Sequence, residues 1–255
     1  MTIGGQSAGA GSVGFIAMSR LAKGLFQWAI AESHARYSRD TESRYLSVSW
    51  RSLKDADAAG TKFMEQHGAH SIAEMRTLPW EQLIVAGNEA DMSVETGSDA
   101  KPPLFRPVID GYSQTYANGT QNDVAFIAGS NRDETGAVPE NTFAKRRAAT
   151  AGPGAPGLPH INVTVADFDS AAKRKFGPLS DSFLKLYSAS NDDEAAQQNN
   201  EAARDNSRFS TYLWTSDWTK KADWPVYTYY WTHRPTGDPG GAPHGSEILF
   251  VFNNL

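Results

Sequence analysis

A glycine-flanked serine near the start of the chain has the spacing of a catalytic nucleophile. The segment is Thr2-Ile3-Gly4-Gly5-Gln6-Ser7-Ala8-Gly9-Ala10, in which Gly5-x-Ser7-x-Gly9 is the nucleophile-elbow pattern. A sharp turn from a strand to a helix would lift the serine hydroxyl, and we expect its crowding to require glycine on both sides. The Ala8 N–H would then point to a developing oxyanion. A glycine-rich turn without catalytic function is the alternative.

A serine nucleophile needs a base, and the base needs an orienting acid. Among six histidines, His244 lies in a loop rich in glycine and proline that is suited to aim its ring. Asp133 and Glu134 follow an apolar strand and are adjacent, so only one of them can point into a site. The order serine, acid, histidine is the chain order of the α/β-hydrolases. An acidic turn and a loop histidine without a catalytic role are the alternatives.

The elements that must position these residues alternate between strands and helices. Expected strands are Thr2-Ile3, 25–33, 123–129 and 225–232. Expected helices are 13–21, 55–66, 165–176, 179–188 and 192–220, with short helices opening near Ser71 and Pro79. Segments 86–101 and 152–159 are expected loops. The pattern predicts an α/β class with a mostly parallel sheet, flanking helices and a helical excursion before the last strand. Sites in such sheets collect beyond the carboxyl ends of the strands, where the three candidate residues lie.

Composition limits the possible functions. The chain has 255 residues, a net charge of −5 and no cysteine, so it has no disulfide and no thiolate metal site. It lacks a basic cluster, which excludes nucleic acid as an expected partner. No apolar run approaches the ~20 residues of a membrane span. Sequons at Asn118 and Asn162 favour a secreted protein, although such short patterns also arise by chance.

The whole chain resembles the type B carboxylesterases, the cholinesterase and carboxylesterase group of α/β-hydrolases, and its elbow is similar to that of fungal members. Four stretches carry the resemblance: the elbow at 2–10, the strand at 25–33, the acid loop Ser130–Gly136 and the His-Gly-x-Glu block Pro243–Asn253. In the family, Glu is commoner than Gln at the position of Gln6.

The resemblance implies an α/β-hydrolase fold and the hydrolysis of carboxylic esters through an acyl-enzyme. Ser7 would be the nucleophile, His244 the general base and then acid, and Glu134 the acid that orients the histidine. Ala8 would donate one oxyanion N–H, and Glu247 would be structural. The resemblance implies a small-molecule ester as substrate, and neither a cofactor nor a metal.

The chain also departs from the family pattern. Thr135 is inserted before Gly136, and Ser33-His34-Ala35 stands where members often have Ser-Gly-Ser. The N-terminal His-Gly-Gly loop and the C-terminal helices of the family are expected to be missing. Residues 1–255 would then be a partial domain, with only Met1–Ile3 left of the elbow strand and with little activity alone. A non-catalytic esterase-like interaction protein and an inactive esterase fragment remain alternatives.

Overall fold

A parallel four-stranded sheet organises the computed structural model, which describes residues 1–37, 51–83, 104–109, 120–134, 137–138, 163–233 and 241–254. Its strands are β1 (Thr2–Gln6), β2 (Trp28–Glu32), β5 (Ala125–Asn131) and β6 (Val226–Trp231). Their order is β1-β2-β5-β6, and each pair of neighbours is parallel. Each parallel pair needs a long crossover connection, so helices must separate these strands along the chain. This confirms the α/β class with a mostly parallel sheet.

Apart from α1 and α11, the helices have bounds close to those expected from the sequence. They are α1 (Ala8–Met18), α3 (Leu53–Gln66), α4 (Ile72–Met75), α5 (Trp80–Leu83), α8 (Val165–Phe176), α9 (Ser180–Leu186), α10 (Asp192–Thr219) and α11 (Ile248–Val251). Short 3-10 helices are η1 (Arg20–Ala22) and η2 (Gly177–Leu179). The expected loops at 86–101 and 152–159 lie wholly outside the described residues, as does the insertion at 135–136.

The first strand and helix differ from the sequence expectation. β1 continues through Gln6 rather than ending at Ile3, because it pairs with β2 along its whole length. The expected three-residue remnant of the elbow strand is therefore wrong. The helix begins at Ala8 rather than at Val13, since the turn at Ser7 leads directly into it.

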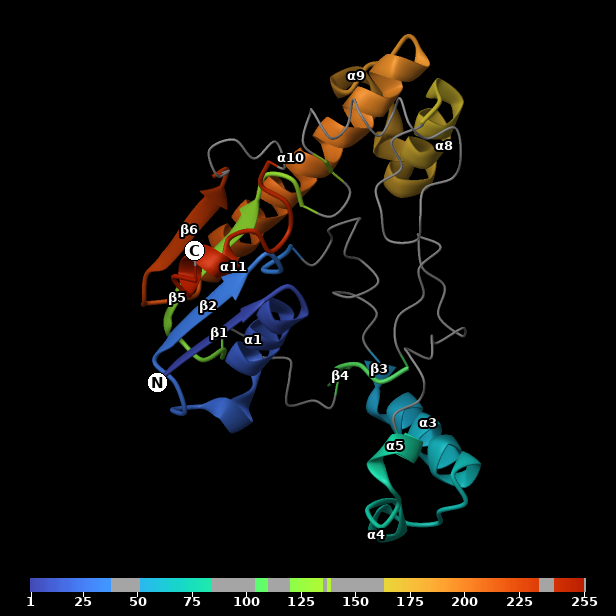
Figure 1. Ribbon diagram of the computed structural model, residues 1–255, viewed down its shortest axis with the longest axis vertical. Coiled ribbons are helices and arrows are strands. Elements are labelled where there is room, and N and C mark those ends of the chain that lie inside the picture. The colour runs from blue at the N-terminus through green and yellow to red at the C-terminus, as the bar shows by residue number, and fades with distance from the viewer. Residues whose placement is uncertain are drawn as a thin grey trace.

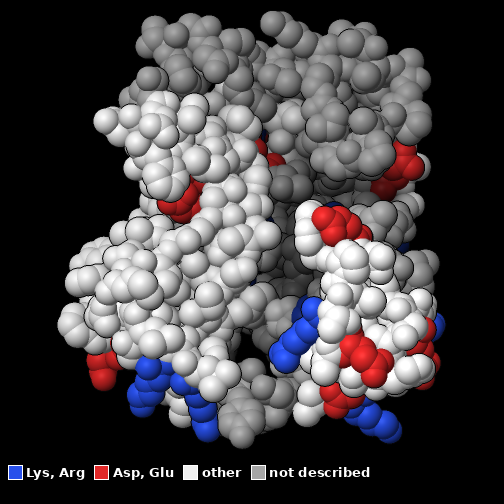
Figure 2. Space-filling model, turned by 60° about the horizontal axis from the view of Figure 1, so that its bottom comes forward, with Lys and Arg blue, Asp and Glu red and all other residues white. Residues whose placement is uncertain are grey.

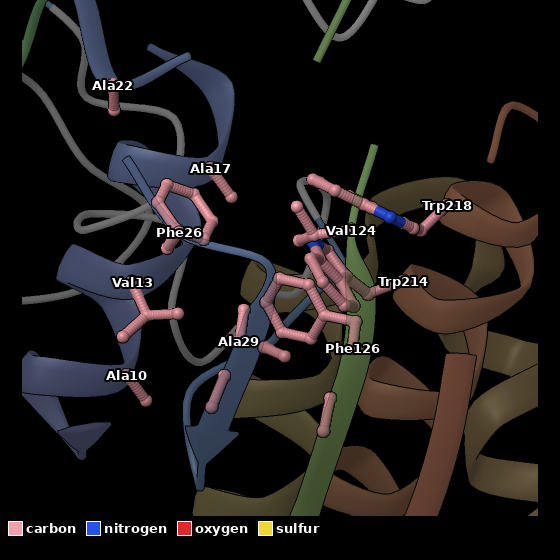
Figure 3. Close-up of a cluster of buried hydrophobic side chains, with 13 residues drawn as sticks. Ala10, Val13, Ala17, Ala22, Phe26, Ala29, Val124, Phe126, Trp214 and Trp218 are labelled. Atoms are coloured by element: carbon pink, nitrogen blue, oxygen red, sulfur yellow. The ribbon is translucent and has the colours of Figure 1, made fainter. Parts of the chain in front are cut away.

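The main core lies between one face of the sheet and two helices, α1 and α10 (Figures 1 and 3). Alternate residues of the strands point to this face, as the two-residue period of a strand requires. Phe126 of β5 lies against the stacked rings of Trp214 and Trp218, with its centroid 5.0 Å from that of Trp214. The buried cluster consists of Ala10, Val13, Ala17, Ala22, Phe26, Ala29, Ala31, Ala35, Val124, Phe126, Ala128, Trp214 and Trp218.

The opposite face of the sheet carries exposed apolar side chains. Trp28, Ile127 and Tyr227 lie on three neighbouring strands and are all exposed. Ile127 and Tyr227 are partners in the ladder between β5 and β6. Among the described elements, α1 and α10 therefore cover one face of the sheet only.

Helix α10 joins the sheet to a second, smaller core. Its first turns pack Ala195 and Ala196 against Phe168 of α8, with Phe183 and Tyr187 nearby. Its last turns pack on β5 and β6. Figure 1 shows α8 and α9 beside one end of this long helix.

A separate unit contains α3, α4 and α5 with a small parallel pair, β3 (Arg51–Ser52) and β4 (Val108–Ile109). Ser52 caps α3 by accepting the Asp55 N–H, and Ser71 caps α4 by accepting the Glu74 N–H. Such caps satisfy donors that a helix start leaves unpaired. The unit lies away from the four-stranded sheet in Figure 1.

The described surface mixes charges of both signs. The face in Figure 2 intersperses Lys and Arg with Asp and Glu, and its described residues form no continuous basic area. None of the described helices combines the length and the apolar character that a membrane span requires. Within the described ranges, no three His, Asp or Glu side chains gather as a metal site would need.

Trp218 is expected to be essential for stability. Its side chain is 0% exposed, whereas that of Trp224, just beyond the same helix, is 58% exposed. Trp218→Ala would empty the core below β5 and lower the free energy of unfolding by about 3–5 kcal/mol. Trp224→Ala is the matched control and should change it by less than about 0.5 kcal/mol. Urea unfolding measures both, and equal effects would contradict the assigned core.

Candidate active site

The nucleophile elbow is formed by the turn at Ser7 between β1 and α1. Ser7 has φ 57° and ψ −122°, a left-handed conformation that a non-glycine residue rarely adopts. Its N–H donates to Glu32 O at 2.8 Å, and its carbonyl accepts the Gly11 N–H at 3.1 Å. Its side chain makes no capping hydrogen bond to the helix. The hydroxyl is therefore available at the sheet edge, beside the helix N-terminus that presents the Ala8 N–H.

The glycine requirement of the elbow is one-sided. A Cβ on Gly5 would lie 2.4 Å from the carbonyl carbon of Gly9 and 2.5 Å from its oxygen. A Cβ on Gly9 would meet nothing within 4 Å among the described residues. The expectation that crowding requires glycine on both sides of Ser7 is therefore wrong for Gly9. The first turn of α1 folds back over the end of β1, and only the strand side is crowded.

The acid and the base come together in loops that follow β5 and β6. His244 Nδ1 lies 2.5 Å from Glu134 Oε2. The Glu134 side chain is fully buried, whereas His244 is half-buried. The second oxygen, Glu134 Oε1, accepts the Asn131 N–H at 2.8 Å. Both carboxylate oxygens are thus occupied, which holds the ring of His244 in a single orientation.

This contact shifts the pKa values of both partners. Burial alone would raise the pKa of Glu134, but hydrogen bonds from His244 and the Asn131 N–H outweigh it and hold that pKa below its usual value. The same hydrogen bond raises the pKa of His244, although burial of the ring opposes the rise. The site therefore pairs an ionised carboxylate with a ring whose protonated form is stabilised.

The other ring nitrogen of His244 faces Gln6 rather than Ser7. Gln6 Nε2 lies 3.2 Å from His244 Nε2, and no hydrogen bond links the ring to Ser7 within the described ranges. An amide nitrogen only donates, so Nε2 accepts and the ring proton is assigned to Nδ1, beside Glu134. This is the tautomer of a general base. Catalytic hydrogen bonds are often long in the absence of substrate.

The neighbouring acid, Asp133, faces away from the histidine ring. Its Oδ1 pairs with Arg204 of α10 at 2.8 Å, and its Oδ2 accepts the Ala242 N–H at 3.0 Å. Of the two adjacent acids, Glu134 is thus the one that contacts His244. Glu247 is also buried and accepts a short hydrogen bond from the Asn131 amide, a position that connects the two loops.

The variant segment after β2 fits its surroundings. Ala35 is buried in the main core, where a hydroxyl would lack partners. His34 lies against α1, where a Cβ on Gly11 would come within 2.8 Å of its ring. Ser33 has φ 65°, and its buried hydroxyl contributes to the lowered pKa of Glu134.

The whole chain, residues 1–255, matches the family model described as "Carboxylesterase family". The chain belongs to the carboxylesterase family. It is 26% identical over 265 residues to a fumonisin B1 esterase of Sphingopyxis macrogoltabida, a match covering 100% of this chain and 42% of that protein. Two solved structures of a PNB esterase superpose with TM-scores of 0.57 and 0.56, at 22% and 21% identity. They are covered to 47% and 49% of their lengths and support the α/β-hydrolase fold.

The chain thus spans less than half the length of the esterases that it matches. Within this span, the carboxylesterase-family chain brings His244 and Glu134 into contact and places Ser7 at an elbow. The contact of Gln6 with His244 and the pairing of Arg204 with Asp133 are not predicted by any pattern noted in the sequence. One pattern in the sequence could have indicated that Arg204 is buried. It lies at helical spacing on the same face of α10 as the apolar residues of that helix.

Gly5→Ala is expected to disrupt the elbow. The new Cβ would clash with backbone atoms, so the free energy of unfolding should fall by about 1–3 kcal/mol. Gly9→Ala is the matched control from the same motif and should change it by less than about 1 kcal/mol. Urea unfolding measures both changes. A Gly5→Ala variant as stable as Gly9→Ala would contradict the described turn.

Glu134→Gln is expected to lower the pKa of His244. The substitution removes the negative charge that stabilises the protonated ring, so the ring should release its proton at a lower pH. NMR titration of the His244 ring nitrogens measures the change, and Glu81→Gln on the exposed surface of α5 is the control. An unchanged pKa of His244 in Glu134→Gln would show that the hydrogen bond is absent in solution.

Proposed function

We propose that this chain carries the catalytic triad of a serine hydrolase that acts on carboxylic esters. Ser7 is the nucleophile, His244 the general base and Glu134 the orienting acid. The observation that carries the proposal is the 2.5 Å contact of His244 with a buried carboxylate, beside an elbow serine with φ 57°. Membership of the carboxylesterase family supports the same chemistry.

The first half of the reaction forms an acyl-enzyme. Ser7 Oγ attacks the ester carbonyl carbon while its proton passes to His244 Nε2, which carries no proton in the assigned tautomer. Gln6 must release Nε2 for this transfer, since its amide is the group that faces that nitrogen. The carbonyl oxygen becomes negative and is stabilised by the Ala8 N–H at the start of α1.

The second half of the reaction releases the acid. Once the alcohol has left with the proton from His244, which completes formation of the acyl-enzyme, His244 takes a proton from the water that attacks the acyl-enzyme. The proton returns to Ser7 Oγ as the carboxylic acid leaves. Glu134 stays ionised throughout and stabilises the imidazolium, as its lowered pKa favours. None of these steps calls on a metal or a cofactor.

The raised pKa of His244 sets the direction of the pH dependence. Only the neutral ring accepts the proton of Ser7, so ester hydrolysis rises with pH as His244 loses its proton. Because Glu134 raises the pKa of His244, this rise occurs at a higher pH than for an ordinary histidine.

The substrate class is a small carboxylic ester. Nitrophenyl esters of short acids suit a first assay because the nitrophenol that hydrolysis releases is coloured. Their short acyl groups also need only a small acyl pocket. Similarity to a fumonisin B1 esterase makes fumonisin B1 a second substrate to test.

Ser7→Ala is expected to abolish hydrolysis of nitrophenyl acetate, because loss of the nucleophile lowers kcat by about 10⁶ in a serine hydrolase with a complete site. Glu134→Gln should leave residual activity after a fall of about 10⁴, because it loses orientation rather than the nucleophile. Ser12→Ala is a matched control on the exposed side of α1 and should retain activity. A fluorophosphonate should label the wild-type protein once and Ser7→Ala not at all.

Two results would contradict the proposal. Unchanged hydrolysis in Ser7→Ala would exclude Ser7 as the nucleophile. A folded wild-type protein that neither reacts with the fluorophosphonate nor hydrolyses an ester would instead favour a non-catalytic interaction protein or an inactive esterase fragment.

A further inference from the structure

Arg204 of α10 makes a buried ion pair next to the acid loop. Arg204 and Asp133 are 4% and 2% exposed. Arg204 Nε and Nη2 donate to Asp133 Oδ1 at 3.1 and 2.8 Å, and Nη2 also donates to Val138 O at 2.9 Å. Nη1 reaches Glu201 one turn earlier at 2.6 Å. The guanidinium therefore ties the chain on both sides of Glu134 to the helix.

Asp133 in turn holds the loop that carries the histidine. Its backbone N–H donates to Ala242 O at 3.0 Å, and its Oδ2 accepts the Ala242 N–H at 3.0 Å. One oxygen of Asp133 thus serves Arg204 and the other serves Ala242, two residues before His244. The carboxylate is fully used by these contacts, and it can adopt only one orientation.

Asn131 makes a second connection between the same loops. Its amide Nδ2 donates to Pro243 O at 2.8 Å, and its backbone N–H holds Glu134 Oε1 at 2.8 Å. The acid loop therefore makes hydrogen bonds to Ala242 and Pro243, the two residues that precede His244. Of these contacts, only those with Ala242 come from Asp133, the residue that pairs with Arg204 of α10.

We infer that Arg204 and Asp133 are positioning residues, which fix the loop of His244 so that its ring meets Glu134 and points Nε2 toward the elbow. This role rests on the proposed function, in which His244 is the base. Neither residue touches the reacting atoms. A buried ion pair contributes little net stability but costs a great deal when one partner is lost, because the other charge stays buried. Without Arg204, the Asp133 carboxylate would be buried and unpaired. It would therefore turn toward solvent and lose its hydrogen bond with the Ala242 N–H.

The test compares Arg204→Met with Arg208→Met in the purified protein. Arg208 lies one turn further along α10 and is exposed, with its guanidinium 5.2 Å from the centroid of the Tyr230 ring, so it is a matched control. In Arg204→Met the pKa of His244 should fall toward its usual value as the ring leaves Glu134. The kcat for nitrophenyl acetate should fall about 10²-fold, the cost of a misplacement near 1 Å, with little change in KM. Arg208→Met should match the wild type.

A role in stability alone would give a different result. Lost activity in proportion to the unfolded fraction, with a wild-type pKa of His244 in the folded molecules, would overturn the inference. If Arg204→Met does not fold, Arg204→Lys decides, because it keeps the charge but loses the planar donor fork. Arg204→Lys should lower both kcat and the pKa of His244 by a smaller amount, and wild-type values of both would overturn the inference.

The failure of the proposed function would be recognised separately. A wild-type protein without ester turnover and without fluorophosphonate labelling contradicts the triad. The pKa of His244 still reports whether Arg204 positions its loop, since NMR titration needs no catalysis.

Discussion

The hydrogen bond between His244 and Glu134 joins loops that lie 110 residues apart in the sequence. It can form because β5 and β6 are parallel neighbours, so both loops leave the same edge of the sheet. The crossover between these strands contains α10, whose Trp214 and Trp218 pack against Phe126 of β5. The packing of one helix on one face of the sheet thus determines where acid and base meet.

The nucleophile depends on a different part of the same sheet. Ser7 directly follows β1, an edge strand of the described sheet, and its N–H donates to the carbonyl of Glu32 at the end of β2. The elbow follows β1, whereas the acid and the base follow β5 and β6. Within the described sheet, the pairing of β2 with β5 connects these two parts. The contact of Gln6 with His244 Nε2 links the elbow to the loop of the histidine.

Sequence reasoning succeeded where a residue's neighbours in the chain determine its environment. The elbow pattern, the strand before Glu134 and helix 165–176 follow from local spacing, and the structure has β1, β5 and α8 there. It failed where distant residues decide. The open space at Gly9 and the partner of Asp133 depend on how α1 and α10 pack, which no local pattern records. Secretion, the resemblance to fungal members of the family and the missing N-terminal loop stay predictions.

Helix α10 shows why charge is used where apolar packing would suffice for stability. Its buried stripe runs from alanine at 195 and 196 through Arg204 to tryptophan at 214 and 218. The alanines and tryptophans fill volume and accept small rotations of their partners, since dispersion has no direction. Arg204 holds Asp133 by two directed bonds, and Ser207 one turn on accepts from Arg36, beyond β2, at 2.7 Å. Polar contacts with α10 thus fix the exits of two strands, where direction matters for the site.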